Sequence, residues 1–340
     1  MAFRTLIVGL GRSGAGLHLP ALAAARASQS AGLLFDRGPV LTFDPGPGAP
    51  GPLPGSVRVG SLAAAAGLSD PGATVVHLCT PPTARLDVLA HLAELGFRKI
   101  LVEKPLTSDE AALDGIEALR GRWDLDLIIV AQWLTSKLTT RIKQILRDGE
   151  YGSLRFIRVI QRKPRFTRSQ ASGGHPTAFD VEVPHSVGLA LEIAGTARVL
   201  SARWADMTFG DVTIPRLGAA WLELDHASGI GTWIHSDLTA PDRERRITLD
   251  LDGATLTGHY PSSGADDYAQ LRISAGDRDR REIFRDDALT AFMVTSYERF
   301  ARGRDAEGDA QLARSAEVVR LIGAAKRICA GEQACQPLVG

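Results

Sequence analysis

The feature of the sequence that most constrains the fold is a glycine-rich turn directly after the first apolar run. Residues 3–8 have the composition of a buried strand, and residues 17–25 have that of a helix. Between them, the pattern G-x-G-x-x-G allows a tight turn, a close approach of the backbone to a pyrophosphate, and close packing of the helix on the strand. The phosphates would rest at the helix N-terminus. The turn is therefore predicted to bind a dinucleotide through Gly9, Gly11, Arg12, Ser13 and Gly14.

An acidic residue at the end of the second strand is expected to hold the adenosine ribose hydroxyls. Asp44 closes the apolar run Val40–Phe43, whereas Asp36 closes a shorter run and lies nearer the usual spacing from the glycines. We favour Asp44, because its run is the better strand. A proline and a glycine follow Asp44 and offer no site for a 2′-phosphate, so NAD is the predicted cofactor. NADP is the alternative, since Arg37 stands beside Asp36.

Another apolar run, Ile100–Val102, ends in Glu103, Lys104 and Pro105. A short apolar run predicts a buried strand of a parallel sheet, and ligands of such sheets bind just past the carboxyl ends of the strands. Proline cannot continue a strand and fixes its own φ, so the chain has to turn with Lys104 held in place. Lys104 is therefore a candidate for chemistry. The alternative is a solvated Glu-Lys pair at the end of a strand.

The pattern of elements changes along the chain, whose 340 residues favour two domains. Strands and helices alternate at first, which predicts a Rossmann-type α/β dinucleotide-binding domain over residues 1–132. Runs typical of strands follow one another from Leu154 onward. Residues 133–340 are therefore predicted to form a second domain with a large, mostly antiparallel β-sheet.

Composition argues against several classes of protein. The 39 basic residues balance the 39 acidic ones, so no general attraction to nucleic acid or to an anionic membrane is expected. No eighteen apolar residues run together, so no membrane span is predicted. The three cysteines, Cys79, Cys329 and Cys335, fit neither a disulfide framework nor a zinc site. We expect a reducing cytoplasm and no metal.

The order of the motifs, Gly9–Gly14, then Cys79–Pro82, then Glu103–Pro105, resembles that of the Gfo/Idh/MocA family of nicotinamide-dependent oxidoreductases. The likeness spans nearly the whole chain and is most specific over Leu95–Leu106, which looks like the family's passage from helix to strand before E-K-P. Members usually act on sugars, inositols or related polyols, and their second domain is an open-faced sheet whose outer side mediates dimers or tetramers. The resemblance thus implies that residues 133–340 form a substrate-binding and oligomerisation domain with an open-faced β-sheet. The resemblance implies that the cofactor site also includes Thr80, Pro81, Glu103, Lys104 and Gln132.

The resemblance also implies a catalytic histidine, because the family usually carries D-x-x-x-H at the start of a helix in the second domain. The best match ends at His185, which becomes the expected general acid and base, with Lys104 as its electrostatic partner at the carbon that gives or takes hydride. Four residues earlier stands Val181, so either Asp180 or Glu182 takes over the aspartate's role, or the role is lost. Asp180 is the candidate orienting carboxylate, and a helix cap is the alternative.

One departure from the family pattern and one group of basic residues bear on the substrate. Arg85 stands where many members have a histidine after the T-P-P segment. A group of basic residues predicts either a site for a phosphorylated sugar or nucleotide-sugar diphosphate, or a solvated face: Arg162, Lys163, Arg165 and Arg168.

Together these features favour an oxidoreductase that transfers hydride between NAD(H) and a secondary alcohol or ketone of a sugar, sugar phosphate, nucleotide sugar or cyclitol. Two alternatives stay open. An NAD-dependent glycoside hydrolase of the same family would use the cofactor only transiently, and a catalytically silent dinucleotide-binding regulator would not turn over. The expected partners are the small-molecule substrate and further copies of the chain, as a homodimer or homotetramer, without nucleic acid or membrane.

Overall fold

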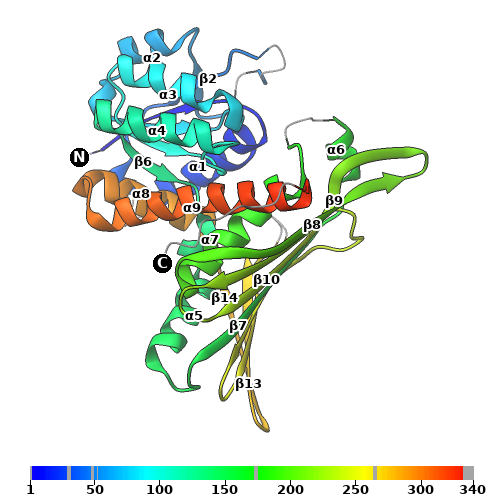
Figure 1. Ribbon diagram of the computed structural model, residues 1–340. Helices are drawn as coiled ribbons and strands as arrows, with labels where there is room; N and C mark the ends of the chain where they lie inside the picture. The colour runs from blue at the N-terminus through cyan, green and yellow to red at the C-terminus, as the bar shows by residue number, and fades with distance from the viewer. Residues whose placement is uncertain are drawn as a thin grey trace. The chain divides into compact units, whose positions relative to one another are not determined.

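The structure is a computed structural model that describes residues 2–28, 32–46, 50–51, 53–171, 175–262 and 266–331. Cys335 lies outside these residues. The chain divides into two compact units, which comprise the described parts of residues 1–132 with 289–319, and of 133–288 with 320–340 (Figure 1). Residues 289–319, which the sequence analysis assigned to the second domain, thus belong to the first unit. No helix in the described ranges is both long enough and apolar enough to cross a membrane.

The first unit is built on a parallel six-stranded sheet in the order β3-β2-β1-β4-β5-β6. Its strands are β1 (Arg4–Val8), β2 (Val40–Phe43), β3 (Ser56–Arg58), β4 (Thr74–Leu78), β5 (Lys99–Val102) and β6 (Asp126–Ile129). The strand order reverses between β1 and β4, and ligands of doubly wound sheets bind outside the carboxyl ends of the strands at such a point. The predicted Rossmann-type architecture is confirmed.

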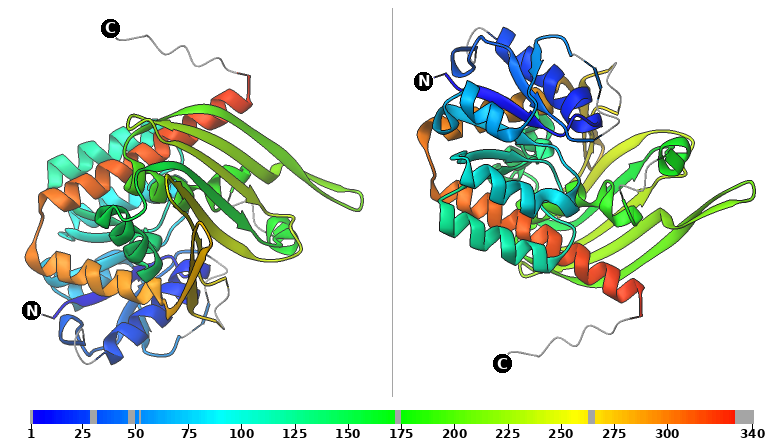
Figure 2. Two further views of the ribbon diagram at one scale, coloured as in Figure 1. Left: turned by 90° about the horizontal axis from the view of Figure 1, so that it is seen from below. Right: turned by 90° about the horizontal axis from the view of Figure 1, so that it is seen from above.

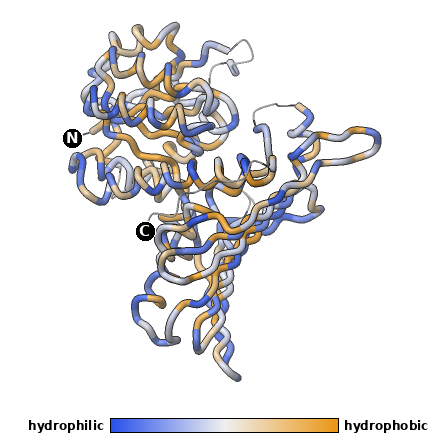
Figure 3. Tube along the Cα trace, in the orientation of Figure 1, coloured by the Kyte–Doolittle hydropathy of each residue, from blue (hydrophilic) through white to orange (hydrophobic). Residues whose placement is uncertain are grey.

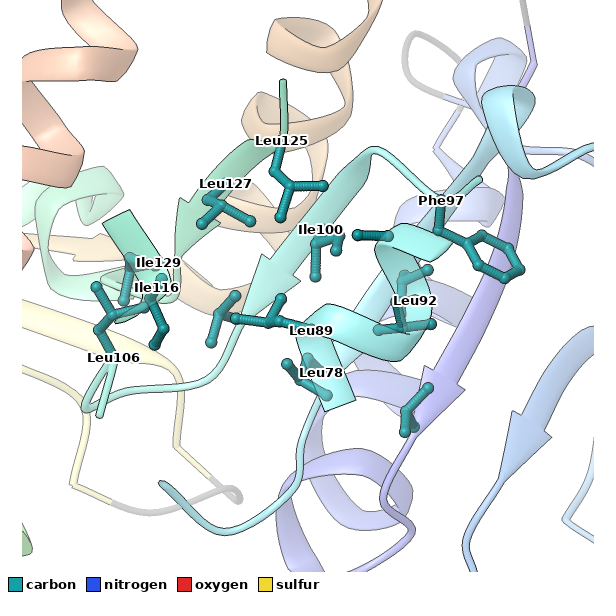
Figure 4. Packing of buried hydrophobic residues seen from close by; sticks show 14 of the residues in the cluster. Leu78, Leu89, Leu92, Phe97, Ile100, Leu106, Ile116, Leu125, Leu127 and Ile129 are labelled. Atoms are coloured by element: carbon teal, nitrogen blue, oxygen red, sulfur yellow. The ribbon is translucent and has the colours of Figure 1, made fainter. Parts of the chain in front are cut away.

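Helices cover both faces of this sheet because successive strand residues point to opposite sides. Leu6, Val8, Ile100 and Val102 pack into one core with α2, α3, α4 and the start of α9 (Figure 4), and Ile7 and Leu101 pack into another with α1 and α8. The helices are α1 (Leu19–Ala27), α2 (Leu62–Leu68), α3 (Arg85–Glu94), α4 (Glu110–Trp123), α8 (Ala288–Arg302) and α9 (Ala306–Cys329). Residues 289–319 belong to the first unit because α8 and the start of α9 supply buried side chains to these two cores.

The second unit is built on an eight-stranded sheet in the order β14-β13-β12-β11-β7-β10-β9-β8, with a parallel pair only at β7 and β10. Its strands are β7 (Leu154–Arg162), β8 (Ala197–Phe209), β9 (Val212–His226), β10 (Gly231–Asp237), β11 (Glu244–Leu251), β12 (Thr255–His259), β13 (Tyr268–Ala275) and β14 (Arg278–Arg285). The predicted, mostly antiparallel sheet is confirmed. Strands β8 and β9 form a long hairpin (Figure 2).

Hydrophobic and polar residues alternate along the strands of the second sheet (Figure 3), which is the pattern of a sheet with one covered face. The covered face packs against α5 (Lys137–Asp148) and α7 (Val183–Ala194). Ser136 caps α5 by accepting the backbone N–H groups of Leu138 and Thr139, and Gly149 ends it at a φ of 67°. A third helix of this unit is α6 (Phe166–Ala171).

Candidate functional site

The glycine-rich turn lies between β1 and a helix, as predicted. Gly9 has a φ of +93°, and a Cβ atom there would lie 2.8 Å from the carbonyl carbon of Cys79. A Cβ atom on Gly14 would lie 2.0 Å from the carbonyl oxygen of Gly9. By contrast, apart from its chain neighbours, no described residue has an atom within 4 Å of the position that a Cβ atom on Gly11 would take. Two glycines thus let the chain pack tightly, and the third keeps open the space in which a pyrophosphate could approach the backbone.

The helix after the turn starts with a π-helical segment, Gly14–His18, before α1 continues it. Such wide turns occur often at functional sites. Arg12 is exposed and Ser13 is half-buried at the start of this helix, where a dinucleotide phosphate would meet free N–H groups. His18, at the end of the wide turn, is fully buried.

The two candidate ribose-binding acids lie at opposite ends of the first sheet. Asp44 follows β2, and its carboxylate accepts the N–H groups of Leu10 at 2.6 Å and Gly46 at 2.8 Å. Asp36 instead pairs at 2.7 Å with Arg4, the first residue of β1. The hydrogen bond from Arg4 lowers the pKa of Asp36. Asp44 is therefore the acid that lies at the carboxyl ends of the strands, beside the glycine-rich turn.

The segment after β4 carries a buried hydroxyl that fits a ligand. The Oγ1 atom of Thr80 is buried and has no hydrogen-bond partner among the described residues. The Arg85 guanidinium donates two hydrogen bonds to the Thr80 carbonyl oxygen, at 3.1 and 3.0 Å. Burial lowers the pKa of Arg85 to about 10, although the charge of Glu103 acts in the opposite direction. The exposed Pro81 follows Thr80, and Gln132 follows β6.

Glu103 and Lys104 follow β5, as predicted. Lys104 donates its backbone N–H to the Glu103 carboxylate at 3.0 Å, and the bond between Lys104 and Pro105 is cis. Lys104 is half-buried, and Glu103 is 7% exposed. Burial by itself would raise the pKa of Glu103, but a hydrogen bond from His18 and the charges of His18, Lys104 and Arg85 lower it to about 2.

A chain of buried polar groups runs from Glu103 through the core of the first unit. The Glu103 carboxylate lies 3.0 Å from His18 Nε2, and His18 Nδ1 lies 2.9 Å from His77 Nδ1. His77 Nε2 lies 3.0 Å from the Tyr297 hydroxyl, which lies 2.7 Å from the Thr5 hydroxyl. Sequence reasoning missed this chain, since its members come from β1, the wide turn, β4, the end of β5, and α8.

His185 lies in the first turn of α7 and is half-buried in the second unit. Its ring stacks on Trp133 at a centroid distance of 5.7 Å, and Trp133 stacks on Tyr260 at 4.4 Å. Thr139 donates to the Trp133 carbonyl oxygen at 2.6 Å, so the Tyr260 hydroxyl donates to Thr139 at 2.8 Å. Burial raises the pKa of Tyr260, which makes it a poor proton donor. The Trp133 ring thus packs against the His185 ring.

The two carboxylates near His185 have different partners. Asp180 accepts the backbone N–H and the hydroxyl of Thr177 in a capping box, and its other oxygen pairs with Lys326. Glu182 forms an ion pair with Lys163 of the segment after β7, and its carbonyl oxygen accepts the His185 N–H at 3.1 Å. The contacts of Asp180 are those of a cap, which was the alternative reading of its position.

A polar hollow that sequence reasoning missed lies near Glu182. It is lined by Gln161 and Arg162 at the end of β7, by Lys163 directly after it, by Glu182, and by Arg243, Arg245 and Ser262. Two of the basic residues predicted to act together, Arg162 and Lys163, thus line it. By contrast, Arg165 is 4% exposed and donates to Ser169, and Arg168 lies in α6. Among the described residues, no three His, Cys, Asp or Glu side chains are placed to hold a metal ion.

No family model matches the chain, and no curated protein matches it in sequence. Solved structures match its fold over nearly its whole length. A 3-ketoreductase from Actinomadura kijaniata, in complex with TDP-benzene and NADP, has a TM-score of 0.76 at 13% identity, and the match covers 97% of this chain and 98% of that one. A UDP-N-acetylglucosamine 3-dehydrogenase from Acidithiobacillus ferrooxidans has a TM-score of 0.73 at 17% identity, with 98% and 99% covered.

An oxidoreductase from Agrobacterium radiobacter, in complex with NAD⁺, L-tartaric acid and magnesium, has a TM-score of 0.74 at 14% identity, with 98% of each chain covered. At these identities the likeness establishes the fold of the chain. The residues at the site have to carry any argument about its chemistry.

Proposed function

We propose that the protein is an NAD(P)-dependent oxidoreductase that interconverts a secondary alcohol and a ketone of a sugar-type substrate. One observation carries the proposal. The glycine-rich turn, Asp44, Thr80 and Lys104 follow β1, β2, β4 and β5, so all four lie at the carboxyl edge of one parallel sheet. Dinucleotides bind at this edge in sheets of this strand order. Solved structures of the same fold carry NADP or NAD⁺.

The residues of the first unit fit a dinucleotide. Gly11 leaves open space for a ligand, and Thr80 has a hydroxyl without a hydrogen-bond partner among the described residues. The carboxylate of Asp44 can accept hydrogen bonds from ribose hydroxyls. When bound, the nicotinamide ring supplies the hydride acceptor or donor. We assign the adenosine ribose to Asp44, and this assignment favours NAD over NADP because a carboxylate repels a 2′-phosphate.

His185 and Lys104 are the proposed catalytic residues. Oxidation of an alcohol requires a base that takes the hydroxyl proton, and the imidazole of His185 suits this task near neutral pH. The Lys104 ammonium would stabilise the developing alkoxide. The stacking of His185 on Trp133 and the hydrogen bond from the Lys104 backbone N–H to Glu103 support the proposal, because the first packs against the His185 ring and the second holds the backbone that carries the Lys104 side chain. In the reverse direction, the same groups would polarise the ketone and return the proton.

The test is turnover by the purified protein with NAD or NADP and a panel of free and phosphorylated hexoses and inositols. A lasting rise in absorbance at 340 nm is expected with at least one substrate. Lys104→Met and His185→Asn should each keep cofactor affinity while lowering kcat/KM by a factor of roughly 10² to 10⁴. Because the two residues act as a unit, the double variant should be little worse than the poorer single one.

The outcomes separate the alternatives. Cleavage of a glycoside with NAD present but without a lasting absorbance change would instead identify the NAD-dependent hydrolase. Tight cofactor binding without any turnover would identify a regulator. Near-normal turnover in His185→Asn would refute the acid and base assignment.

We also propose that the open face of the second sheet binds a second copy of the chain. Trp221 stacks on His235 at 4.9 Å, and the Arg203 guanidinium lies 4.1 Å from the centroid of the Trp221 ring. These side chains lie on the face opposite the buried Leu222 and Ile234. Half-exposed aromatic side chains of this kind are enriched in interfaces between subunits. Light scattering that gave the monomer mass of 36.3 kDa at micromolar concentration would contradict the proposal.

A further inference from the structure

The polar hollow near Glu182 lies on the covered face of the second sheet. Gln161 follows the buried Ile157 and Val159 at the alternate positions of β7, and Arg245 precedes the buried Ile247 and Leu249 on β11 in the same way. The hollow has room for about one water-sized group, and it shares Arg243, Arg245 and Ser262 with a wider one of about 250 Å³. The wider part is also lined by Tyr260, which stacks on Trp133, the partner of His185.

Gln161, which lines this hollow, has an unsatisfied hydrogen-bond acceptor. The residue is 2% exposed, and its Nε2 atom donates to the Glu182 carbonyl oxygen at 3.2 Å and to the Ser186 hydroxyl at 2.7 Å. The orientation of the amide is fixed, because only the NH₂ group can face a carbonyl oxygen. The Oε1 atom is therefore left buried, and it has no hydrogen-bond partner among the described residues. Such an atom is costly to leave unpaired, and a ligand hydroxyl would satisfy it.

The charges around the hollow do not cancel. Lys163 pairs with Glu182, and Arg162 pairs with Glu244. Arg245 donates to the Pro261 carbonyl oxygen at 2.8 Å. Within the described ranges, neither Arg245 nor Arg243 has a carboxylate partner. Two carboxylates line the wider part: that of Glu244, which is paired with Arg162 and Arg246, and that of Asp266. Outside these ion pairs, two guanidinium groups thus outnumber one carboxylate, that of Asp266.

We propose that the wider hollow, where Arg243 and Arg245 line it, binds a phosphoryl group that is linked to the sugar-type substrate. Arg243 and Arg245 donate to the phosphoryl oxygens, since guanidinium groups make strong, charge-assisted hydrogen bonds to phosphate. Gln161 Oε1 accepts a sugar hydroxyl and so fixes the sugar next to the helix that carries His185. The inference rests on the proposed function for the identity of the sugar, but the phosphoryl site itself can be tested without turnover.

The test measures binding by calorimetry, with the full chain and four probes: glucose, glucose 6-phosphate, inorganic pyrophosphate and UDP-glucose. At least one phosphoryl probe should bind more tightly than glucose by a factor of 10 or more. Arg243→Gln and Arg245→Gln should each weaken that probe by roughly 10-fold, which is the effect of one charge-assisted hydrogen bond. The preferred probe separates a phosphate monoester from a nucleoside diphosphate.

The matched control is Arg272→Gln, which removes the same charge from an exposed arginine of β13. Arg272 pairs with Asp279 of β14. This variant should leave binding unchanged. Gln161→Leu should weaken sugar-containing probes but leave pyrophosphate unaffected, because pyrophosphate has no sugar hydroxyl. Folding of each variant is checked by its thermal unfolding midpoint.

Two results would overturn the inference. One is equal binding of glucose and of all phosphoryl probes. The other is phosphoryl binding that neither arginine substitution weakens more than Arg272→Gln does. Turnover of a neutral sugar without any phosphoryl binding would refute this inference and leave the proposed function intact. Phosphoryl binding that depends on the arginines, without turnover of any substrate, would uphold the site and refute the proposed function.

Discussion

His18 and His77 meet through like atoms, because their Nδ1 nitrogens lie 2.9 Å apart in the core of the first unit. A hydrogen bond between them requires a proton on one nitrogen and a lone pair on the other. The ionised carboxylate of Glu103 accepts from His18 Nε2. A charged His18, the form whose charge lowers the pKa of Glu103, would donate at Nδ1 as well, whereas the uncharged form accepts there from His77. His77 Nε2 then accepts the proton of Tyr297, whose oxygen accepts from Thr5. Burial lowers the pKa of His77, which keeps that ring neutral in this arrangement.

The first prediction concerns the far end of this chain. Tyr297→Phe removes one hydroxyl and leaves His77 Nε2 buried without a donor. It should lower the free energy of unfolding by about 1–3 kcal/mol, the usual cost of an unsatisfied buried group. Urea denaturation measures the change. Tyr268→Phe, at a residue that is 52% exposed, is the control and should change stability by less than about 0.5 kcal/mol. Equal effects of both substitutions would mean that the chain of hydrogen bonds adds no stability.

A second prediction follows from Glu103. Its pKa is lower in the folded protein, about 2, than the ordinary value of 4.5. Its contribution to stability is therefore present above pH 4.5 and is lost as the pH falls toward 2. A difference of this size corresponds to on the order of 3 kcal/mol. Glu103→Gln should be less stable than the native protein at pH 7, and the gap should narrow below pH 4.5.

Urea denaturation of both proteins from pH 3 to 7 measures this gap. The charged groups that act on Glu103, besides His18, are Lys104 and Arg85. Neither Lys104 nor Arg85 loses its charge in this range, so the narrowing reports the pair of Glu103 and His18. A difference in stability that stayed constant with pH would show that the surroundings of Glu103 do not lower its pKa.

The sequence predicts those parts of the site whose residues directly follow a recognisable strand. The turn at Gly9–Gly14, Asp44 and Lys104 each follow a recognisable strand, and the carboxyl ends of parallel strands share one edge. The chain of His18, His77 and Tyr297 could not be predicted in this way. These residues lie 59 and 220 positions apart, and their pairing depends on how α1, β4 and α8 pack. Each looks, in sequence, like an ordinary core residue.

The same reason explains why Gln161 was missed. In sequence it is one polar residue near the end of a strand, and its buried acceptor exists only because α7 supplies partners for the other side of the amide. In sequence, Arg243 and Arg245 stand in a segment of mixed charge, Asp242–Arg246. They line a hollow because β11 lies beside β7 in the sheet, which the order of strands along the chain does not reveal.

A third prediction distinguishes the two acids considered for the ribose. Asp44→Ala should weaken binding of NAD by roughly 10-fold or more, because a charged acceptor of ribose hydroxyls is lost. Asp36→Ala removes the partner of Arg4 at the other end of the strand and should leave NAD affinity unchanged. Fluorescence titration measures both, and NADP should bind the native protein more weakly than NAD. Tighter binding of NADP, or loss of NAD affinity only in Asp36→Ala, would transfer the ribose to the segment around Asp36.

The last prediction concerns Asp180, the candidate for the acid that orients the catalytic histidine. Its carboxylate caps the turn at Thr177 and pairs with Lys326, so these contacts predict a role in stability. Asp180→Asn and Lys326→Met should each lower the free energy of unfolding by about 1–3 kcal/mol. Both should retain kcat/KM within about threefold for the folded protein, whereas His185→Asn should lose a factor of roughly 10² to 10⁴.

The dependence of kcat/KM on pH separates the two roles of Asp180. If the residue only stabilises the fold, Asp180→Asn keeps the rise of kcat/KM that reports the free base at the pH of the native protein, and Lys326→Met does the same. An orienting carboxylate would favour the charged imidazole, so its loss would lower the pKa of His185 and move that rise to lower pH. A shift in Asp180→Asn that Lys326→Met does not share, together with a large loss of kcat, would show that Asp180 acts on His185.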